Sequence, residues 1–333
     1  MKKWSMLAGL VMVTVALLLT GCNSNASDGG SSAEGTDEGG DQIEIAGILM
    51  QSDVEWFKYI QMGMEKAAEE NNVNLTIGNA NEDITEESNL LDTYSSQGKD
   101  AVLLSAIDSS ASAEAIKRAQ EKDVLVVNYN TGVDLNVQEY FVGIDNFELG
   151  AQAGRSLVEY VEENMGGEAK VAMITLSMYE IGKQRAEGFL SEVEQAPGIE
   201  IVAQQDAAGP EDGANVTETI IRGNPDIDLI WGANEGGAVG AIVGVQSSGL
   251  EDKVKVFGTD MSLQTAQYLL DDSNPYYAVS TQQPYEIGYQ AVITAVKALQ
   301  GEEVEAETIV PLDMYSKEDK EKVQAYLDEY SGL

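Results

Sequence analysis

The sequence predicts an α/β fold made of two lobes, each with a parallel sheet covered by helices. Short apolar runs alternate with longer stretches in which apolar residues recur every three or four positions, as Trp56, Ile60 and Met64 do. Such runs are typical of parallel strands that are buried on both faces. About 290 residues follow a polar N-terminal segment, more than one core usually accommodates, so we expect two lobes. A change of composition near residues 143–146 marks the boundary between them.

The first 21 residues are predicted to be a secretion signal that is not part of the fold. Lys2 and Lys3 form a basic start, and the uncharged apolar run over residues 7–20 is short for a membrane span. The run leads into the sequence LTGC, which ends at Cys22 and resembles the lipobox of bacterial lipoproteins. We therefore expect cleavage before Cys22, lipidation of its thiol, and an extracytoplasmic protein held at the cell membrane by that anchor alone. The alternative is a short transmembrane helix followed by an incidental cysteine.

Residues 22–41 follow as an acidic tether. Beyond Cys22 they are mostly Gly, Ser, Asp and Glu with no large apolar side chain, so they cannot form a core. From Ile43 onward the composition changes, and ten apolar runs are predicted to be strands. These runs are 43–49, 73–77, 101–105, 124–128, 140–143, 170–175, 199–203, 229–231, 253–258 and 277–280.

The composition excludes several functions. The chain has 19 basic and 57 acidic residues and a net charge of −38, so it would repel nucleic acid. We interpret the carboxylates as a solvated exterior suited to a saline or alkaline habitat, with an interaction surface as the alternative. There is no histidine, and Cys22 is the only cysteine. These absences exclude an intramolecular disulfide, a His or Cys zinc site, and a nucleophile activated by histidine.

Polar and aromatic residues follow the predicted strands at their carboxyl ends, where ligands bind to parallel α/β sheets. These segments are rich in Asn, Asp, Gln and Ser and contain few Lys or Arg residues. They are 50–57, 105–108, 128–130, 145–146, 177–183, 206–210, 234–235, 259–260 and 282–283. Such a lining offers hydrogen-bond partners for hydroxyl groups, so we expect a polyhydroxylated ligand such as a sugar.

Five segments, in this order and spacing, resemble the type I periplasmic binding proteins for sugars, of the ribose-binding kind. They are the Trp56-Phe57 pair, KQRAEGF at 183–189, NPDIDLIWGANE at 224–235, VFGTD at 256–260, and QQPYEIG at 282–288. The resemblance covers residues 43–312. It implies two Rossmann-like lobes joined by a three-crossing hinge, with residues 42–144 plus 283–311 in the first lobe. Residues 145–282 plus 312–333 would form the second lobe and the C-terminal tail, and ligand binding would close the hinge.

The resemblance also implies ligand contacts, each of which has a structural alternative. Trp56 and Phe57 match aromatic residues that stack on the sugar ring, although an aromatic pair at a helix start is commonly core. Asp260 matches a carboxylate that binds neighbouring hydroxyls, and would otherwise be a helix N-cap. Asn234 matches an amide that binds one diol, and would otherwise cap a loop. Gln282 lies at a hinge crossing and would reach the ligand from there.

The chain departs from the ribose-binding pattern at several positions, and four of them remain candidate ligand contacts. Lys183 stands in place of an arginine, Ser105 in place of an asparagine, and Asn128 with Tyr129 in place of an Asp-Arg pair. Lys183 would otherwise be a solvated charge on a helix. Two aromatic residues of the second lobe are replaced by Ala208 and Thr259, unless Tyr179 supplies a stacking surface. The ligand is therefore expected not to be plain ribose.

Four further features are not expected to contribute to a site. Trp231 lies inside a predicted strand and is interpreted as core, and Arg185 is placed on an outer helical turn. The glycines at 236, 237, 240 and 244 do not have the Gly-x-Gly-x-x-Gly spacing of a dinucleotide site, so we expect no cofactor. The segment from Asp134 begins like a calcium loop but lacks its third acidic ligand and its glycine, so we expect no metal.

The sequence favours a binding protein over an enzyme. The first hypothesis is a monomeric lipoprotein that delivers a monosaccharide or similar polyol to the permease of an ABC importer. The second is a sensory module that presents its closed form to a membrane histidine kinase or chemoreceptor. An extracellular carbohydrate enzyme is the third, but no pair of carboxylates stands out in the predicted cleft.

Overall fold

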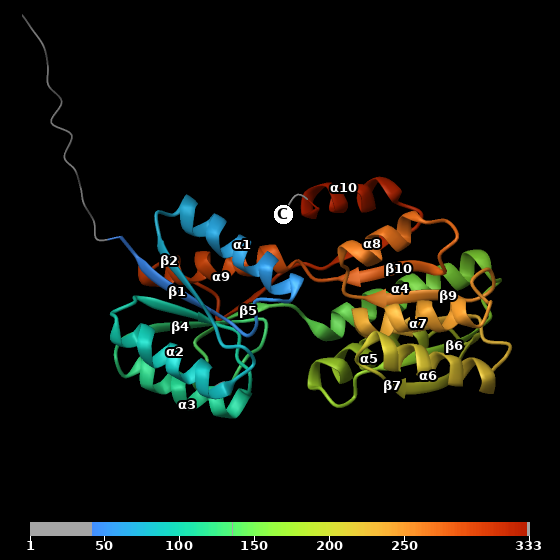
Figure 1. Ribbon diagram of the computed structural model, residues 1–333, viewed down its shortest axis with the longest axis horizontal. Coiled ribbons are helices and arrows are strands. Elements are labelled where there is room, and N and C mark those ends of the chain that lie inside the picture. The colour runs from blue at the N-terminus through green and yellow to red at the C-terminus, as the bar shows by residue number, and fades with distance from the viewer. Residues whose placement is uncertain (1–41, 135, 332–333) are drawn as a thin grey trace, which may run out of the picture. The chain divides into compact units, whose positions relative to one another are not determined.

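Two six-stranded sheets with helices packed on their faces make up the described part of the protein (Figure 1). The computed structural model describes residues 42–134 and 136–331. The first sheet has the strand order β11-β5-β4-β3-β1-β2, and the second has the order β12-β10-β9-β8-β6-β7. Paired strands are parallel throughout, except that β12 runs antiparallel to β10. The predicted α/β fold with two lobes is confirmed.

The elements alternate along the chain as the apolar pattern predicts. The strands are β1 (Glu44–Leu49), β2 (Asn74–Asn79), β3 (Ala101–Leu104), β4 (Leu125–Tyr129), β5 (Tyr140–Gly143), β6 (Ala169–Thr175), β7 (Ile199–Asp206), β8 (Leu229–Gly232), β9 (Lys255–Thr259), β10 (Tyr276–Thr281), β11 (Glu307–Ile309) and β12 (Asp313–Ser316). The helices are α1 (Glu55–Glu70), α2 (Ile84–Ser96), α3 (Ser109–Gln120), α4 (Asn146–Asn164), α5 (Glu180–Val193), α6 (Pro210–Gly223), α7 (Glu235–Ser247), α8 (Leu263–Leu270), α9 (Pro284–Leu299) and α10 (Lys320–Tyr330).

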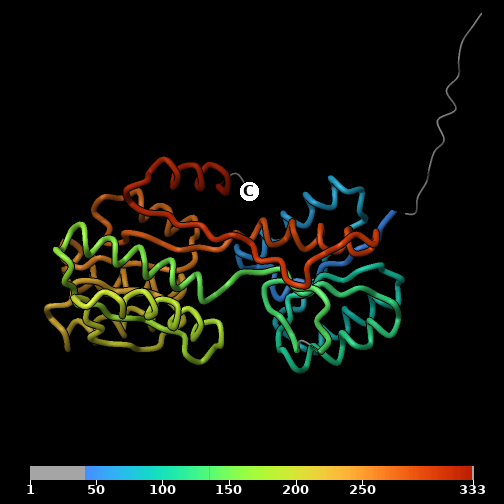
Figure 2. The backbone as a smooth tube through the Cα atoms, turned by 180° about the vertical axis from the view of Figure 1, so that it is seen from behind, coloured from blue at the N-terminus to red at the C-terminus, as the bar shows by residue number. Residues whose placement is uncertain are grey.

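All ten predicted strands are present, with ends that differ from the prediction by a few residues. The sequence analysis missed β11 and β12, which have only three and four residues and partly exposed side chains. Each adds to one edge of a sheet, β11 beside β5 and β12 beside β10. The chain passes between the two sheets three times: from β5 to α4, from β10 to α9, and from β11 to β12 (Figure 2).

Side-chain chemistry explains where several helices begin. The carboxylates of Asp83 and Asp108 accept hydrogen bonds from the first free backbone N–H groups of α2 and α3. Ser262 and Thr265 form a reciprocal capping box at the start of α8. These caps lie three or four residues after the ends of β2, β3 and β9. Each of these strands therefore leads into its helix through a short loop at the carboxyl edge of the sheet.

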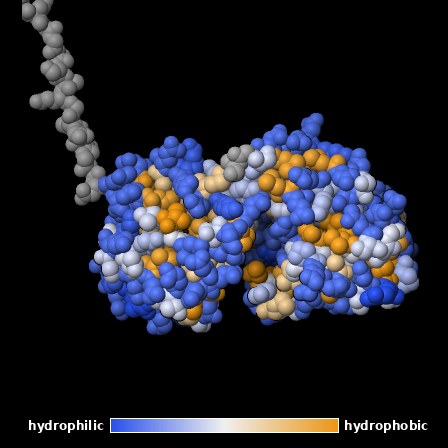
Figure 3. Space-filling model, viewed as in Figure 1, coloured by the Kyte–Doolittle hydropathy of each residue, from blue (hydrophilic) through white to orange (hydrophobic). Residues whose placement is uncertain are grey.

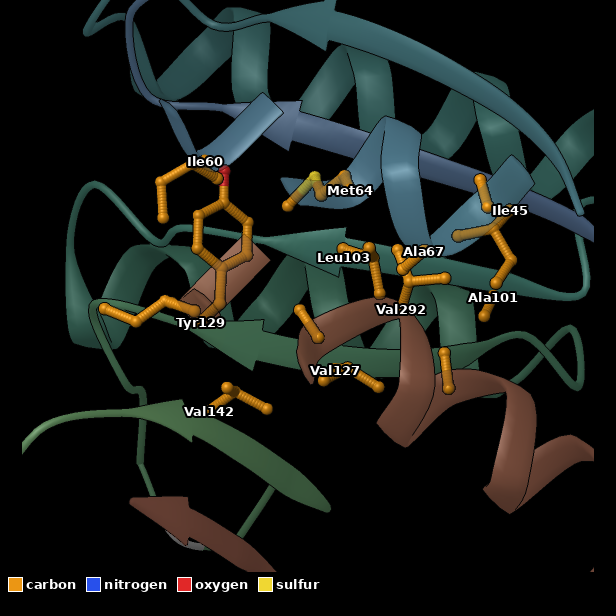
Figure 4. Close-up of a cluster of buried hydrophobic side chains, with 14 of the residues drawn as sticks. Ile45, Ile60, Met64, Ala67, Ala101, Leu103, Val127, Tyr129, Val142 and Val292 are labelled. Atoms are coloured by element: carbon orange, nitrogen blue, oxygen red, sulfur yellow. The ribbon is translucent and has the colours of Figure 1, made fainter. Parts of the chain in front are cut away.

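Apolar side chains cover both faces of each sheet, in four clusters. On one face of the first sheet, α1 and α9 pack onto the strands, and Met64 of α1 and Val292 of α9 belong to the same apolar cluster (Figure 4). In the second sheet, Trp231 is fully buried and its ring stacks on Phe189 at 4.2 Å. The interpretation of Trp231 as core is therefore confirmed.

The glycines that follow β8 have a packing role. A Cβ on Gly236 would lie 2.2 Å from the carbonyl oxygen of Ala208, and one on Gly240 would lie 2.6 Å from the Cα of Gly213. Helices α6 and α7 thus approach with their backbones in contact, which only glycine permits at these two positions. This close approach accounts for a glycine-rich run that does not have dinucleotide-site spacing.

Candidate ligand-binding site

A cleft separates the two lobes, and the loops at the carboxyl ends of strands from both sheets border it. Figure 3 shows the molecular surface hollowed between the two halves. The first sheet contributes the loop after β1 and the end of β4, and the second contributes the loops after β6, β8 and β9. The loops that connect strands to helices in both sheets therefore lie where a ligand in the cleft would contact both lobes.

Asp260 is held in place through both of its carboxylate oxygens. Arg185 Nη1 donates to Asp260 Oδ2 at 2.8 Å, and Gln282 Nε2 donates to Asp260 Oδ1 at 2.8 Å. Asp260 also has a positive φ of 66°. It is not the N-cap of α8, because Ser262 has that position. The carboxylate is thus oriented by a cation and an amide from two different elements.

Arg185 was expected to lie on an outer turn of its helix, and that expectation is wrong. Its side chain is 5% exposed. In addition to Asp260, it donates to Asn146 Oδ1 at 3.0 Å and to the carbonyl oxygen of Ala233 at 3.0 Å. Because the buried guanidinium binds one carboxylate and two further acceptors, its position is fixed, and it fixes the position of Asp260 in turn.

Lys183 lies on the same helix but faces away from this network. It is exposed, and its ammonium pairs with Glu180 on the same helix at 3.2 Å. The structure therefore brings Arg185, and not Lys183, to Asp260. Gly182, Arg185 and Phe189 are three and four residues apart, so they share one face of the helix, and all three are buried. This spacing is the sequence pattern that indicates an inward-facing Arg185.

Asn234 is the N-cap of α7. Its Oδ1 accepts from the backbone N–H of Gly237 at 3.0 Å, and its Nδ2 donates to the carbonyl oxygen of Ala208 at 2.8 Å. Its structural alternative, a cap, is thus realised, and the amide is oriented by these two bonds.

Glu235 is the first residue of α7; it lies in the predicted segment 234–235 but was not named as a candidate ligand contact. Burial first, and then the negative charges of Asp260 and Glu55, raise the pKa of the Glu235 carboxyl, while a hydrogen bond from Ser262 opposes this rise. Asp260 belongs to the second lobe and Glu55 to the first. Carboxylates from both lobes therefore lie near one another at this end of the cleft.

In the first lobe, Trp56 and Phe57 have different surroundings. Their rings meet edge to face with centroids 4.9 Å apart. Phe57 is 5% exposed and belongs to the core, whereas Trp56 is only partly buried. Trp56 Nε1 has no hydrogen-bond partner among the described residues. Trp56 is therefore the member of the pair that has surface available for a ligand.

Ser105, Asn128 and Tyr129 are all fully buried. Ser105 Oγ accepts from Asn130 Nδ2 at 3.2 Å, and Asn128 Oδ1 has no partner among the described residues. The ring of Tyr129 lies in the hydrophobic cluster, and its hydroxyl donates to the carbonyl oxygen of Ile48 at 2.9 Å (Figure 4). Tyr129 thus supports the core beneath the loop after β1 and adds no stacking surface to the cleft.

Two other features concern metals and membranes. Within residues 42–134 and 136–331, no group of three or more Asp, Glu, His or Cys side chains is arranged to hold a metal ion. Asp134 instead accepts hydrogen bonds from the backbone and side chain of Asn136. No helix in the same part of the chain has the length and apolar character to span a membrane. The predicted signal and Cys22 lie outside the described residues.

Comparisons with known proteins agree with this architecture. A family model described as "Periplasmic binding protein domain" matches residues 45–303. The ABC transporter periplasmic-binding protein YphF of Escherichia coli (strain K12) is 30% identical, over 79% of this chain and 82% of that protein. The ribose import binding protein RbsB of Bacillus subtilis (strain 168) is 27% identical, over 78% of this chain and 82% of that protein.

A solved structure has the same fold at full length. It is a periplasmic solute-binding protein of an ABC transporter from Actinobacillus succinogenes 130z with bound D-allose, with a TM-score of 0.76 and 25% identity. The alignment covers 84% of this chain and 100% of that one. With its two α/β lobes and a family match over most of its length, this chain belongs to the periplasmic binding proteins, which are solute-binding proteins and not enzymes.

Proposed function

We propose that the protein captures a monosaccharide or similar polyhydroxylated ligand between its lobes and delivers it to an ABC importer from the extracytoplasmic side of the membrane. The observation that carries this proposal is the fixed carboxylate of Asp260. Arg185 and Gln282 each bind one of its oxygens, so the carboxylate can accept from two neighbouring hydroxyls without reorganising. Trp56 would cover the apolar face of the ring from the opposite lobe.

The relatives support the ligand class. RbsB of Bacillus subtilis is a ribose import binding protein, and the Actinobacillus succinogenes structure holds D-allose. Both ligands are monosaccharides with several neighbouring hydroxyl groups. The second lobe of this chain has Ala208 and Thr259 at positions where the ribose-binding pattern has aromatic residues, so we propose a ligand other than plain ribose.

The lobes would move as two bodies about the three passages between the sheets. We propose a first lobe of residues 42–144 plus 283–311 and a second of residues 145–282 plus 312–333. Closure would bring Trp56 towards Asp260 and exclude water from the ligand. We also propose that lipidated Cys22 and the acidic residues after it tether the protein to the membrane.

Calorimetry against pentoses, hexoses and inositols tests the ligand class. The chain beginning at residue 23 is suitable, because both sheets and their four apolar clusters lie within residues 42–331. We expect one member of the panel to bind with a stoichiometry of about one, since one cleft lies between two lobes. Folded protein that binds none of them would overturn the sugar assignment.

A further inference from the structure

Helix α10, near the C-terminus, is anchored on the second lobe. Val323 is fully buried in the apolar cluster beneath it. The ammonium of Lys322 donates to the carbonyl oxygen of Met314 at 3.0 Å and to Asp313 Oδ1 at 2.9 Å, both in β12. These contacts fix the first half of the helix to the sheet that carries Asp260.

The other end of α10 reaches the first lobe. The ring of Tyr330 meets the ring of Tyr59 in α1, edge to face, with centroids 4.5 Å apart. In Figure 1 the C-terminal end of α10 points across towards α1. Tyr59 is 6% exposed, and its hydroxyl donates to Glu55 Oε1 at 2.7 Å, so the surface that Tyr330 contacts is held in place. Tyr326 lies between the two attachments, with its ring 4.6 Å from that of Tyr330.

The two ends of the helix meet residues adjacent to the candidate site. The hydroxyl of Tyr326 donates to the carbonyl oxygen of Met261 at 3.3 Å, and Met261 follows Asp260 directly. On the first lobe, Glu55 precedes Trp56. Helix α10 therefore contacts Met261, the neighbour of Asp260, in the second lobe, and Tyr59, whose hydroxyl donates to Glu55 beside Trp56, in the first lobe.

We propose that α10 is an inter-lobe strap that holds the cleft open and thereby sets the ligand affinity of the site. The inference rests on the proposed function for its affinity readout. The Tyr59–Tyr330 contact is present while the cleft is hollow (Figure 3). An aromatic pair is favourable over a narrow range of separations, so rotation of one lobe about the hinge disrupts it. Ligand-driven closure thus works against this contact, and its removal shifts the population towards the closed form.

The first measurement needs no ligand. The chain from residue 23 contains no cysteine, so spin labels on Asp53→Cys and Met178→Cys, both exposed in loops that border the cleft, report the separation of the lobes. We expect Tyr330→Ala to enlarge the fraction of molecules with the shorter separation. Tyr330→Phe keeps the ring and should match the unsubstituted chain. Gln324→Ala, an exposed change on the same helix, is the second control.

The second measurement is calorimetry with D-ribose and D-allose on the unlabelled proteins. We expect Tyr330→Ala to bind about 2- to 10-fold more tightly than the unsubstituted chain, from the usual strength of an aromatic pair. A helix with only a structural role would leave the affinity unchanged or weaken it when damaged. Circular dichroism confirms that each variant is folded.

The two measurements separate the strap from the sugar assignment. If no member of the pentose, hexose and inositol panel binds but Tyr330→Ala shortens the separation, the ligand class is wrong and the strap stands. If a sugar binds with unchanged or weaker affinity in Tyr330→Ala, the strap is refuted and the proposed function stands. An unchanged separation in Tyr330→Ala also refutes the strap, whatever the sugars do.

Discussion

Replacing Asp260 with alanine should damage both the stability and the ligand affinity of the protein. The substitution removes the hydrogen bonds from Arg185 and Gln282 and leaves a guanidinium that is 5% exposed without a carboxylate partner among the described residues. Breaking a fully buried ion pair costs about 3–5 kcal/mol. The side chain of Asp260 is 23% exposed, and Arg185 keeps its bonds to Asn146 and Ala233, so we expect a smaller loss of about 2 kcal/mol.

Ligand binding should fall by a similar amount or more. The proposed contacts of two hydroxyls to a charged acceptor are lost, which reduces the binding free energy by at least about 2 kcal/mol and raises the dissociation constant roughly 30-fold. Urea unfolding measures the stability, and calorimetry with the sugar that binds best measures the affinity. The matched control is Asp272→Ala, which removes an ion pair to Lys320 from a side chain that is 82% exposed. That change should leave both the stability and the ligand binding close to those of the unsubstituted chain.

A double substitution separates the two effects. Adding Arg185→Leu to Asp260→Ala removes the uncompensated charge, so part of the lost stability should return while binding stays weak. The reasoning is refuted if Asp260→Ala is as stable as Asp272→Ala, because the ion pair would then contribute nothing. It is also refuted if ligand affinity survives the loss of Asp260, because the site would then lie elsewhere.

Three further predictions follow from other residues. Trp56→Ala should weaken ligand binding by about 2 kcal/mol with little change in the free energy of unfolding, whereas Phe57→Ala should lower the free energy of unfolding by about 3 kcal/mol. Calorimetry measures the binding and urea titration the unfolding. The reverse pattern would show that Phe57, and not Trp56, contacts the ligand. Burial raises the pKa of the Glu87 carboxyl, so above the ordinary glutamate pKa the native state keeps a proton that the unfolded chain releases. The free energy of unfolding therefore falls as the pH rises above that ordinary value. Glu87→Gln should therefore gain stability relative to the unsubstituted chain as the pH rises above 4.5. If urea unfolding shows the same pH dependence for both proteins, the buried-carboxyl argument is contradicted. Cys22→Ser should release the protein from the membrane fraction into the medium, as detergent phase partitioning would show, and a protein that stays bound would indicate an uncleaved span.

The sequence predicted the regular elements well because most of the strands contain an uninterrupted apolar run, as β1, β3 and β6 do. Strands β11 and β12 were not predicted because segments of three and four residues with partly exposed side chains show no detectable pattern of apolar residues. Their pairing depends on the return of the chain to each sheet, which is a tertiary effect.

Side-chain direction was the part of the site that the sequence could not give. Arg185 and Lys183 are two residues apart on α5, and only the packing of α5 decides which one faces Asp260. Tyr129 follows Asn128 directly, yet its ring turns into the core because neighbouring residues in a strand face opposite sides. Glu235 was not named as a candidate because its raised pKa comes first from burial and then from carboxylates that are distant in sequence.

The path of the chain has a consequence for the order in which the protein is completed. Strands β1 to β5 form most of the first sheet, but α9, which covers one of its faces with Ile287, Ala291 and Val292, is made only after the whole of residues 145–282. A Cβ on Gly288 would lie 2.0 Å from the carbonyl oxygen of Ile60, so α1 and α9 pack with their backbones in contact. The lobe that is begun first is therefore completed only after most of the second lobe has been synthesised, and any fragment that ends before residue 284 leaves that first lobe with a bare apolar face.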